Sequence, residues 1–198
     1  MAYPSSSNGL FRAVALGAVL STSSAFAQSN ADTVSVLNRE LLSHDSATVV
    51  LGQWCASHHL ADPPVIKALR DRDLDKPADR LVRARLNATS DEPVRYRHVR
   101  LTCGDHVLSE ADNWYLSARL TPEMNRLLNQ TDTPFGLVVR PLAFHRHTLK
   151  VTELLRHGDA GPTPHAVLRH EAMLTDSAGE PFSYVVETYT SEVLAVSR

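Results

Sequence analysis

The feature that most constrains this chain is a change of pattern at Pro93. Before it, between positions 31 and 60, apolar residues recur at intervals of three and four, as on one face of a helix. After it, segments with the two-residue alternation of strands are separated by turn signals such as Gly104-Asp105. Helices followed by a series of strands predict an α+β domain with one antiparallel sheet. A length of 198 residues is consistent with a single domain.

The segments before Pro93 predict an N-terminal helical layer. We expect two helices between positions 31 and 60, with Ser46 as the cap of the second. Asp62-Pro63-Pro64 predicts a further short turn of helix through Leu69, because proline is tolerated at a first helical position. Positions 71–93 are charge-rich and are interpreted as a surface connection with a short strand around 81–86.

The segments after Pro93 predict the sheet. Strands are expected at 94–103, 107–120, 143–155, 166–174 and 182–194, with helices at 122–130 and 134–139. The prediction is a single antiparallel sheet of about five to six strands, with N-terminal helices and two short inserted helices.

The first 27 residues have the pattern of a secretory signal peptide. Arg12 precedes the apolar run 13–20, and small polar residues lead to the A-x-A site that ends at Ala27. The apolar run is about half the roughly 20 residues that span a bilayer, so no stable membrane anchor is expected after cleavage. The prediction is a mature domain of residues 28–198 that is periplasmic or secreted, and an uncleaved tail is the alternative.

Export changes how the two cysteines are interpreted. Cys55 and Cys103 would enter an oxidising compartment, where a disulfide between them would join the helical layer to the sheet. Two buried free thiols remain an equal alternative, since the sequence does not report the distance between them. The absence of a CxxC motif argues against a thiol oxidoreductase and a structural zinc site.

The charge and histidine patterns exclude several classes of function. A formal net charge of -2 provides no general attraction for a phosphate backbone, so no nucleic-acid partner is expected. His145 and His147 share one face of a predicted strand, but a metal site needs three or four converging ligands. Neither a metal nor a cofactor is therefore predicted.

Two charged residues lie where a strand pattern predicts mainly apolar side chains. Alternation places Arg97 on the same face as Val99 and Leu101, where a guanidinium would need an anion such as a carboxylate. The alternative is an arginine at the sheet margin that reaches water. Glu187 lies in the β-prone run 184–189, and the pattern alone favours an outward, exposed carboxylate. An inward Glu187 could pair with an arginine or donate a proton.

Several short motifs, taken in order, resemble the chorismate pyruvate-lyase family. They are the run Arg97 to Asp105, Trp114 followed by Ala118-Arg119 and Pro122, Thr133-Pro134-Phe135-Gly136, and Gly179-Glu180-Pro181 with Glu187 six residues after the proline. The resemblance covers roughly half of the chain after position 27. The related fold is shared with ligand-binding domains of some bacterial transcription regulators, so the resemblance implies the scaffold more firmly than the reaction.

Together with the leader pattern, the resemblance implies an exported lyase without metal or cofactor. It would eliminate pyruvate from chorismate and leave 4-hydroxybenzoate, or act on a related aromatic carboxylate. Arg97 would bind the ring carboxylate, and Glu187 would act near the ether oxygen as a proton donor or a geometric constraint. Arg119 would hold the second carboxylate, and the backbone at Gly136 would close the pocket. The catalytic residues would then be Arg97 and Glu187, and the ligand a small aromatic carboxylate.

Two other functions remain open at this stage. One is a non-catalytic pocket that binds a small aromatic carboxylate with the same residues. The other is an exported structural or interaction domain that retains only a vestigial pocket. Whether the chain is an enzyme is therefore left undecided.

Overall fold

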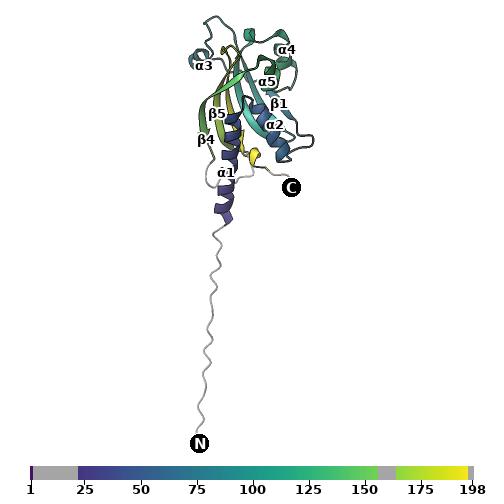
Figure 1. Ribbon diagram of the computed structural model, residues 1–198, viewed down its shortest axis with the longest axis vertical. Helices are drawn as coiled ribbons and strands as arrows, with labels where there is room; N and C mark the ends of the chain where they lie inside the picture. Colours follow the sequence, from purple (N-terminus) through teal and green to yellow (C-terminus); the bar gives the residue numbers. More distant parts are fainter. Residues whose placement is uncertain (2–21, 156–163, 196–198) are drawn as a thin grey trace.

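The computed structural model describes Met1 and residues 22–155 and 164–195, and its core is one six-stranded sheet (Figure 1). The strand order is β1-β2-β3-β6-β5-β4, and every neighbouring pair is antiparallel. The bounds are β1 (Ile66–Asp71), β2 (Val94–Cys103), β3 (His106–Leu116), β4 (His145–Glu153), β5 (Ala166–Thr175) and β6 (Pro181–Thr190). The predicted α+β class with a single antiparallel sheet is confirmed.

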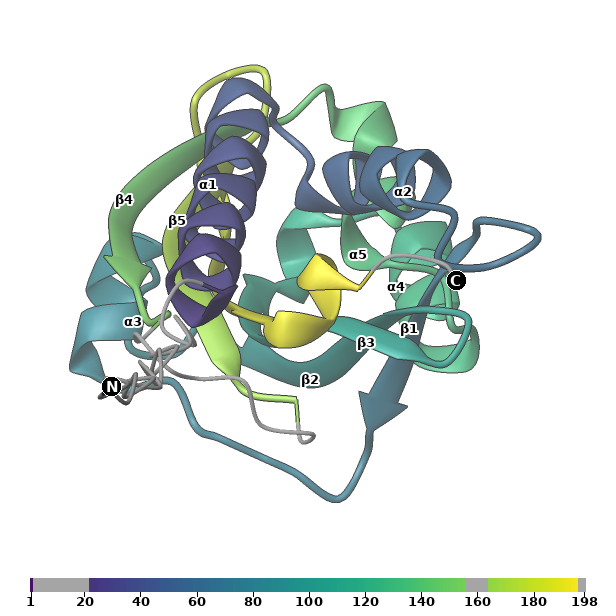
Figure 2. The same ribbon diagram turned by 90° about the horizontal axis from the view of Figure 1, so that it is seen from below.

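The helices lie unequally on the two faces of the sheet. α1 (Thr22–Ser43) and α2 (Ala47–Ser57) cover one face, and α4 (Pro122–Gln130) and α5 (Phe135–Val138) continue that layer beside α2 (Figure 2). α3 (Arg80–Arg85) packs against Trp114 and Tyr184 on the opposite face. Three short 3-10 turns complete the elements: η1 (Ser117–Arg119), η2 (Arg140–Leu142) and η3 (Ser191–Leu194).

The helix-covered face holds two apolar clusters side by side. The first lies under α1 and α2 and includes Leu37, Leu51 and Val99. The second lies under α4 and α5 and includes Leu128 and Phe182. The boundary between the two clusters is where the candidate site lies.

Two predicted elements were wrong. Residues 63–69 do not form a turn of helix, because Ile66–Asp71 pairs with β2 as an edge strand, and Ile66 and Ala68 are buried while Lys67 is exposed. Residues 81–86 do not form a strand, because Asp79 accepts a hydrogen bond from the Val82 amide at 2.8 Å and caps helix α3. In both cases a contact outside the local pattern decided the conformation.

α2 has a local cap at its N-terminus and a covalent link to the sheet near its C-terminus. Ser46 caps its N-terminus as predicted, accepting a hydrogen bond from the Val49 amide at 3.4 Å. Near the other end, Cys55 forms a disulfide with Cys103 at the end of β2. This bridge closes a separation of 48 residues and joins the two layers.

The predicted signal peptide lies largely outside the described residues. Besides Met1, only positions 22–27 of it are described, as the backbone of the first turns of α1. Across the described ranges 22–155 and 164–195, the helices are all too short or too polar to span a membrane.

Candidate functional site

A small cavity opens between the two apolar clusters on the helix-covered face. Val99, Leu101 and Val185 line it from the first cluster, and Phe135, Phe144 and Leu174 from the second. Its volume is about 50 Å³, enough for a few water molecules. The remaining wall is polar and includes Arg97, Asn113, Arg146 and Glu187. A mainly apolar cavity with a few converging polar groups is the usual form of a small-molecule site.

Arg97 enters this cavity from the middle of β2. Strand alternation brings it to the inner face with Val99, as predicted, and only 1% of the residue is exposed. Its Nη2 donates a 3.5 Å hydrogen bond to the Thr133 carbonyl, while Nε and Nη1 are buried without a hydrogen-bond partner. Burial, together with the nearby charge of Arg70, lowers the pKa of Arg97 to about 10. The group is thus a buried cation with unused donors, which is costly without an anion.

Arg146 and Glu187 form a buried ion pair on the wall of the same cavity. Arg146 Nη2 donates to Glu187 Oε2 at 2.5 Å, and the Tyr189 hydroxyl donates to the same oxygen at 3.1 Å. The two side chains are 3% and 9% exposed. Burial acts to lower the pKa of Arg146, but the charges of Glu187, Tyr189 and Asp45 and the hydrogen bond to Glu187 together outweigh burial and raise that pKa. With Arg97 included, the site holds two buried cations and one buried anion.

His170 is a neutral neighbour of this ion pair. It lies opposite Glu187 in the register between β5 and β6 and is fully buried. Its Nε2 is 2.8 Å from Asn38 Oδ1 on α1. Burial lowers the pKa of His170 to about 4, so the ring carries no charge at neutral pH.

The N-terminus of α2 forms the wall opposite the sheet. Ser46 and Thr48 line the cavity there, and Gly136 of α5 lies against them. A Cβ added to Gly136 would be 2.9 Å from Ser46 Oγ and 3.4 Å from Thr48 Oγ1. Gly136 therefore permits close approach of α5 to α2. The first turn of α2, with its partly positive backbone amides, borders the cavity.

Of the four residues predicted to form the binding site, the structure brings three to the cavity and places the fourth elsewhere. Arg97, Glu187 and Gly136 all line the cavity. Arg119 does not, because its guanidinium hydrogen-bonds to the Leu86 and Pro181 carbonyls and lies 3.5 Å from Glu92 Oε2. The expectation that Arg119 holds a second carboxylate in this pocket was wrong, since η1 lies at the far end of β3 and these contacts hold the side chain there.

Glu187 points inward, against the expectation from its strand pattern. It is 7% exposed and shares the inner face with Val185, while Val186 and Thr188 are more exposed. Apolar residues occur on both faces of the run 184–189, so the alternation of side chains does not indicate which face is buried. The partner of Glu187, Arg146, was missed. Its only sequence signal is its place between His145 and His147, on the opposite face of a predicted strand.

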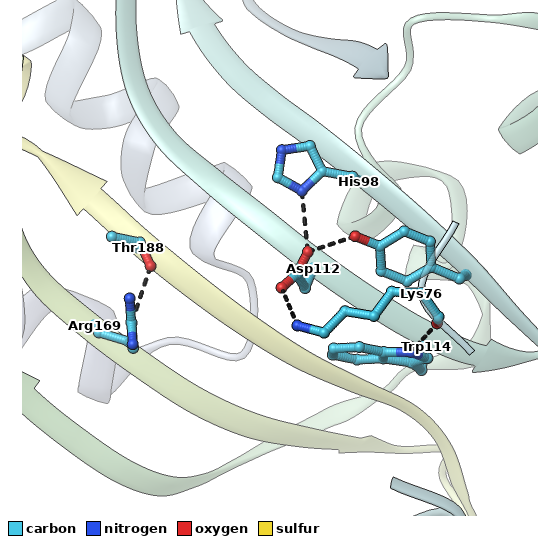
Figure 3. Close-up of polar contacts among 7 residues, drawn as sticks. Lys76, His98, Asp112, Trp114, Arg169 and Thr188 are labelled. Atoms are coloured by element: carbon cyan, nitrogen blue, oxygen red, sulfur yellow. Dashed lines mark hydrogen bonds and ion pairs between the residues drawn. The ribbon is translucent and has the colours of Figure 1, made fainter. Parts of the chain in front are cut away.

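The opposite face of the same strands carries a second polar cluster, around Asp112 (Figure 3). Asp112 accepts hydrogen bonds from the Tyr96 hydroxyl at 2.6 Å and Lys76 Nζ at 3.1 Å, and His98 Nδ1 lies 3.0 Å away. Burial raises the pKa of this carboxyl, but the hydrogen bonds outweigh burial and lower it overall. Lys76 also contacts Trp114, whose Nε1 donates to the Lys76 carbonyl at 2.8 Å. Each group in this cluster has a protein partner.

Metal binding has no candidate site in the described part of the chain. The described residues contain no group of three or more His, Cys, Asp or Glu side chains placed to hold an ion. His145 and His147 are exposed, and His145 lies 3.6 Å from Asp45 while His147 contacts Thr175.

Comparison with curated sequences identifies one clear relative, and no family model matches the chain. The relative is the uncharacterized protein y4mC of Sinorhizobium fredii, which is 47% identical over 174 residues, covering 80% of this chain and 73% of its own length.

Comparison with solved structures finds domains of bacterial regulators. PhnF of Mycobacterium smegmatis aligns with a TM-score of 0.51 at 10% identity, covering 67% of this chain and 61% of PhnF. The alignment with the effector domain of PhnF covers 69% of this chain and 88% of that domain, with a TM-score of 0.48 and 13% identity. The alignment with a GntR-family transcriptional regulator of Bacillus cereus covers 67% of this chain and 96% of the regulator, with a TM-score of 0.44 and 10% identity. This chain thus spans about three fifths of the full PhnF chain. These likenesses show the fold alone.

These findings correct the expected family. The relative found by sequence is y4mC, no family model matches, and PhnF, aligned with a TM-score of 0.51, is a different protein, so membership of an exported branch of the chorismate pyruvate-lyase family is not supported. The fold itself, one antiparallel sheet covered by helices, agrees with that of the regulators.

Proposed function

The chain belongs to the same family as the uncharacterized protein y4mC of Sinorhizobium fredii, and we propose that it is a binding module for a small aromatic carboxylate. The observation that carries this proposal is the buried Arg97 guanidinium, whose Nε and Nη1 have no hydrogen-bond partner in the cavity. A planar guanidinium presents paired donors that match the two oxygens of a carboxylate. A bound carboxylate would supply the missing anion.

The rest of the cavity supports this choice of ligand. The buried side chains of Arg97, Arg146 and Glu187 together carry one excess positive charge, which suits a monocarboxylate. Asp45, the other carboxylate of the lining, is 51% exposed and lies 3.6 Å from His145. The first turn of α2 adds favourable electrostatics for an anion. Phe135 and Phe144 provide apolar walls for a ring.

Glu187 is proposed as a positioning group and not as a proton donor. Its Oε2 already accepts hydrogen bonds from Arg146 and Tyr189, so this oxygen is engaged by the protein itself. In this arrangement it holds Arg146 at the cavity wall. No observation favours catalysis over binding.

An aromatic ring exceeds the present volume of the cavity, so binding requires the wall to move. The four-residue helix α5 contributes Phe135 and Gly136 to that wall and is the shortest α-helix among the described residues. We propose that displacement of α5 admits the ligand, and this step predicts association slower than diffusion.

Binding to Arg97 is tested by calorimetric titration of the purified protein with benzoate and 4-hydroxybenzoate. Saturable binding is expected, and Arg97→Met should weaken it by at least about 100-fold, since each hydrogen bond to a charged group contributes about 1.5–3 kcal/mol. Arg100→Met, an exposed arginine on the same strand, serves as the matched control and should leave the affinity unchanged. Benzamide, which lacks the charge, should not bind.

Two results would contradict the proposal. One is the absence of binding by either carboxylate, and the other is equal affinity for the Arg97→Met variant. Release of pyruvate from chorismate by the same preparation would show an enzyme in place of a binding module.

We also propose that residues 28–198 act as a single domain outside the cytoplasm. The leader pattern that ends at Ala27 and the bridge between Cys55 and Cys103 support this location. In a Gram-negative host, the protein recovered from the periplasmic fraction should begin at Gln28. Recovery of a chain that begins at Met1 from the cytoplasm alone would overturn the proposal.

A further inference from the structure

A second, larger cavity lies beside α4, where β1 ends and β2 begins. Its volume is about 620 Å³, and its wall is mainly polar. Arg70 and Arg72 line it from β1 and the residues that follow, Arg95 and Tyr96 from β2, and Asn125 and Asn129 from α4. None of these residues lines the cavity of Arg97, so this groove is a separate place on the molecule.

The three arginines of the groove have few partners. Arg72 Nη2 donates to the Asn129 carbonyl at 3.0 Å, and Arg70 Nη1 lies 3.5 Å from Asn129 Oδ1. Arg70 Nε is buried without a partner, and within residues 22–155 and 164–195 none of the three arginines forms an ion pair. Asp75 is the carboxylate that lines the groove. Three cations and one anion leave an excess of two positive charges.

The same excess of charge acts on the neighbouring groups. Burial raises the pKa of Tyr115, whose ring lines the groove, while the charges of Arg97, Arg70 and Arg95 act to lower it. Arg70 and Arg72 also lower the pKa of Arg97, in addition to burial. The arginines thus create one positive field at this end of the inner face, although the protein as a whole carries a formal charge of -2.

We propose that this groove binds a phosphate ester of a small organic molecule. A phosphate monoester carries about -1.5 to -2 charges at neutral pH and has three acceptor oxygens, which match three guanidinium groups and an excess of two positive charges. The volume lies within the roughly 300–1,000 Å³ of small-molecule sites, so it also accommodates the organic part. Leu74, which lines the groove and is 50% exposed, offers the organic part an apolar contact. This proposal does not depend on the carboxylate site.

The test is calorimetric titration of the purified protein with phenyl phosphate and inorganic phosphate. Saturable binding of phenyl phosphate, tighter than that of inorganic phosphate, is expected. The double variant Arg70→Met/Arg72→Met should weaken it at least about tenfold, because it removes two charged hydrogen-bonding groups. The double variant Arg100→Met/Arg169→Met removes the same charge from the outer face and should retain the affinity.

The Arg97→Met variant separates the two cavities. It should keep its affinity for phenyl phosphate, whereas a loss would place the phosphate in the first cavity and overturn the proposal. Equal losses in the two double variants would show only a non-specific charge effect and would also overturn it.

Nuclear magnetic resonance of the unmodified protein provides a test that does not depend on the folding of a variant. Phenyl phosphate should shift the side-chain amide signals of Asn125 and Asn129 and leave the Gly136 amide unchanged. Shifts confined to Gly136 and its surroundings, or no shifts at saturating phosphate, would contradict the assignment.

Discussion

Charged residues on the two faces of β2 and β3 differ in their burial and in whether their polar atoms have hydrogen-bonding partners. Arg97 and Asn113 are register partners on the inner face, and the next pair along the strands, His98 and Asp112, lies on the outer face. Asp112 has three hydrogen-bonding partners and a side chain that is 24% exposed. Arg97 is 1% exposed and has two nitrogens without partners.

The difference separates a charged group that contributes to the stability of the fold from one whose free donors could bind a ligand. A network in which every group is satisfied contributes to stability or is neutral. A buried cation with unused donors lowers stability, and such groups concentrate at functional sites. Substitutions of Arg97 and of Asp112 should therefore affect stability and binding in opposite ways.

The largest effect is expected from breaking the ion pair on the inner face. Arg146→Met leaves Glu187 buried and unpaired, so the free energy of unfolding should fall by about 3–5 kcal/mol. Urea denaturation at pH 7 measures this change. The double variant Arg146→Met/Glu187→Gln also removes the unpaired carboxylate charge, so it should recover most of the lost free energy of unfolding. A loss below about 1 kcal/mol in the single variant would show that water already compensates Glu187.

Removing the unpaired Arg97 cation should raise the free energy of unfolding, whereas breaking the ion pair should lower it. Arg97→Met replaces a buried charge by an apolar side chain, and the free energy of unfolding should rise by about 1–4 kcal/mol, by analogy with replacement of buried charged groups. Thermal denaturation monitored by circular dichroism measures the shift. The exposed Arg95, on the same face, is the matched control and its methionine variant should change stability by less than about 0.5 kcal/mol. Destabilisation by Arg97→Met would make Arg97 a structural residue.

On the outer face, removing charge should lower stability and spare binding. Asp112→Asn loses the charged acceptor of Lys76 and His98, so the free energy of unfolding should fall by about 1–2 kcal/mol. The affinity for benzoate should not change. Glu110→Gln, an exposed position on the same face of β3, should have little effect on either quantity. A weaker affinity in Asp112→Asn would show that the two faces are coupled.

The smallest effect is expected at the contact between α5 and α2. Gly136→Ala brings a Cβ to 2.9 Å from Ser46 Oγ. Ser46 must then rotate from its capping position, and loss of a cap costs about 1 kcal/mol. Gly52→Ala in α2 is the control, because its Cβ would meet only Ile66 at 3.9 Å and the helix should gain stability. Equal behaviour of the two alanine variants would contradict a tight approach at Gly136.

Sequence patterns anticipated most of the sheet and one half of the site. Alternation in β2 correctly placed Arg97 inward with Val99, because neighbouring side chains in one strand alternate whatever the strand pairs with. The cap at Ser46 was also predicted, because it depends on residues within one helical turn. Both features are local.

The failures involve residues whose environment is distant in the chain. Ile66–Asp71 is a strand because it pairs with β2, about thirty residues later, and Arg146 meets Glu187 across 41 residues. Arg119 was assigned to the pocket from a motif, but carbonyls of Leu86 and Pro181 hold it elsewhere. No short-range pattern encodes these contacts.

The sequence by itself determined the five strands and the two inserted helices after Pro93, the inward face of Arg97 and the cap of α2, because each follows from backbone geometry over a few residues. Only the tertiary structure decided that Glu187 faces inward to Arg146 and that, among the described residues, no carboxylate forms an ion pair with Arg97. The antiparallel register of six strands brings distant residues to one cavity, and burial there sets the cost of every unpaired charge.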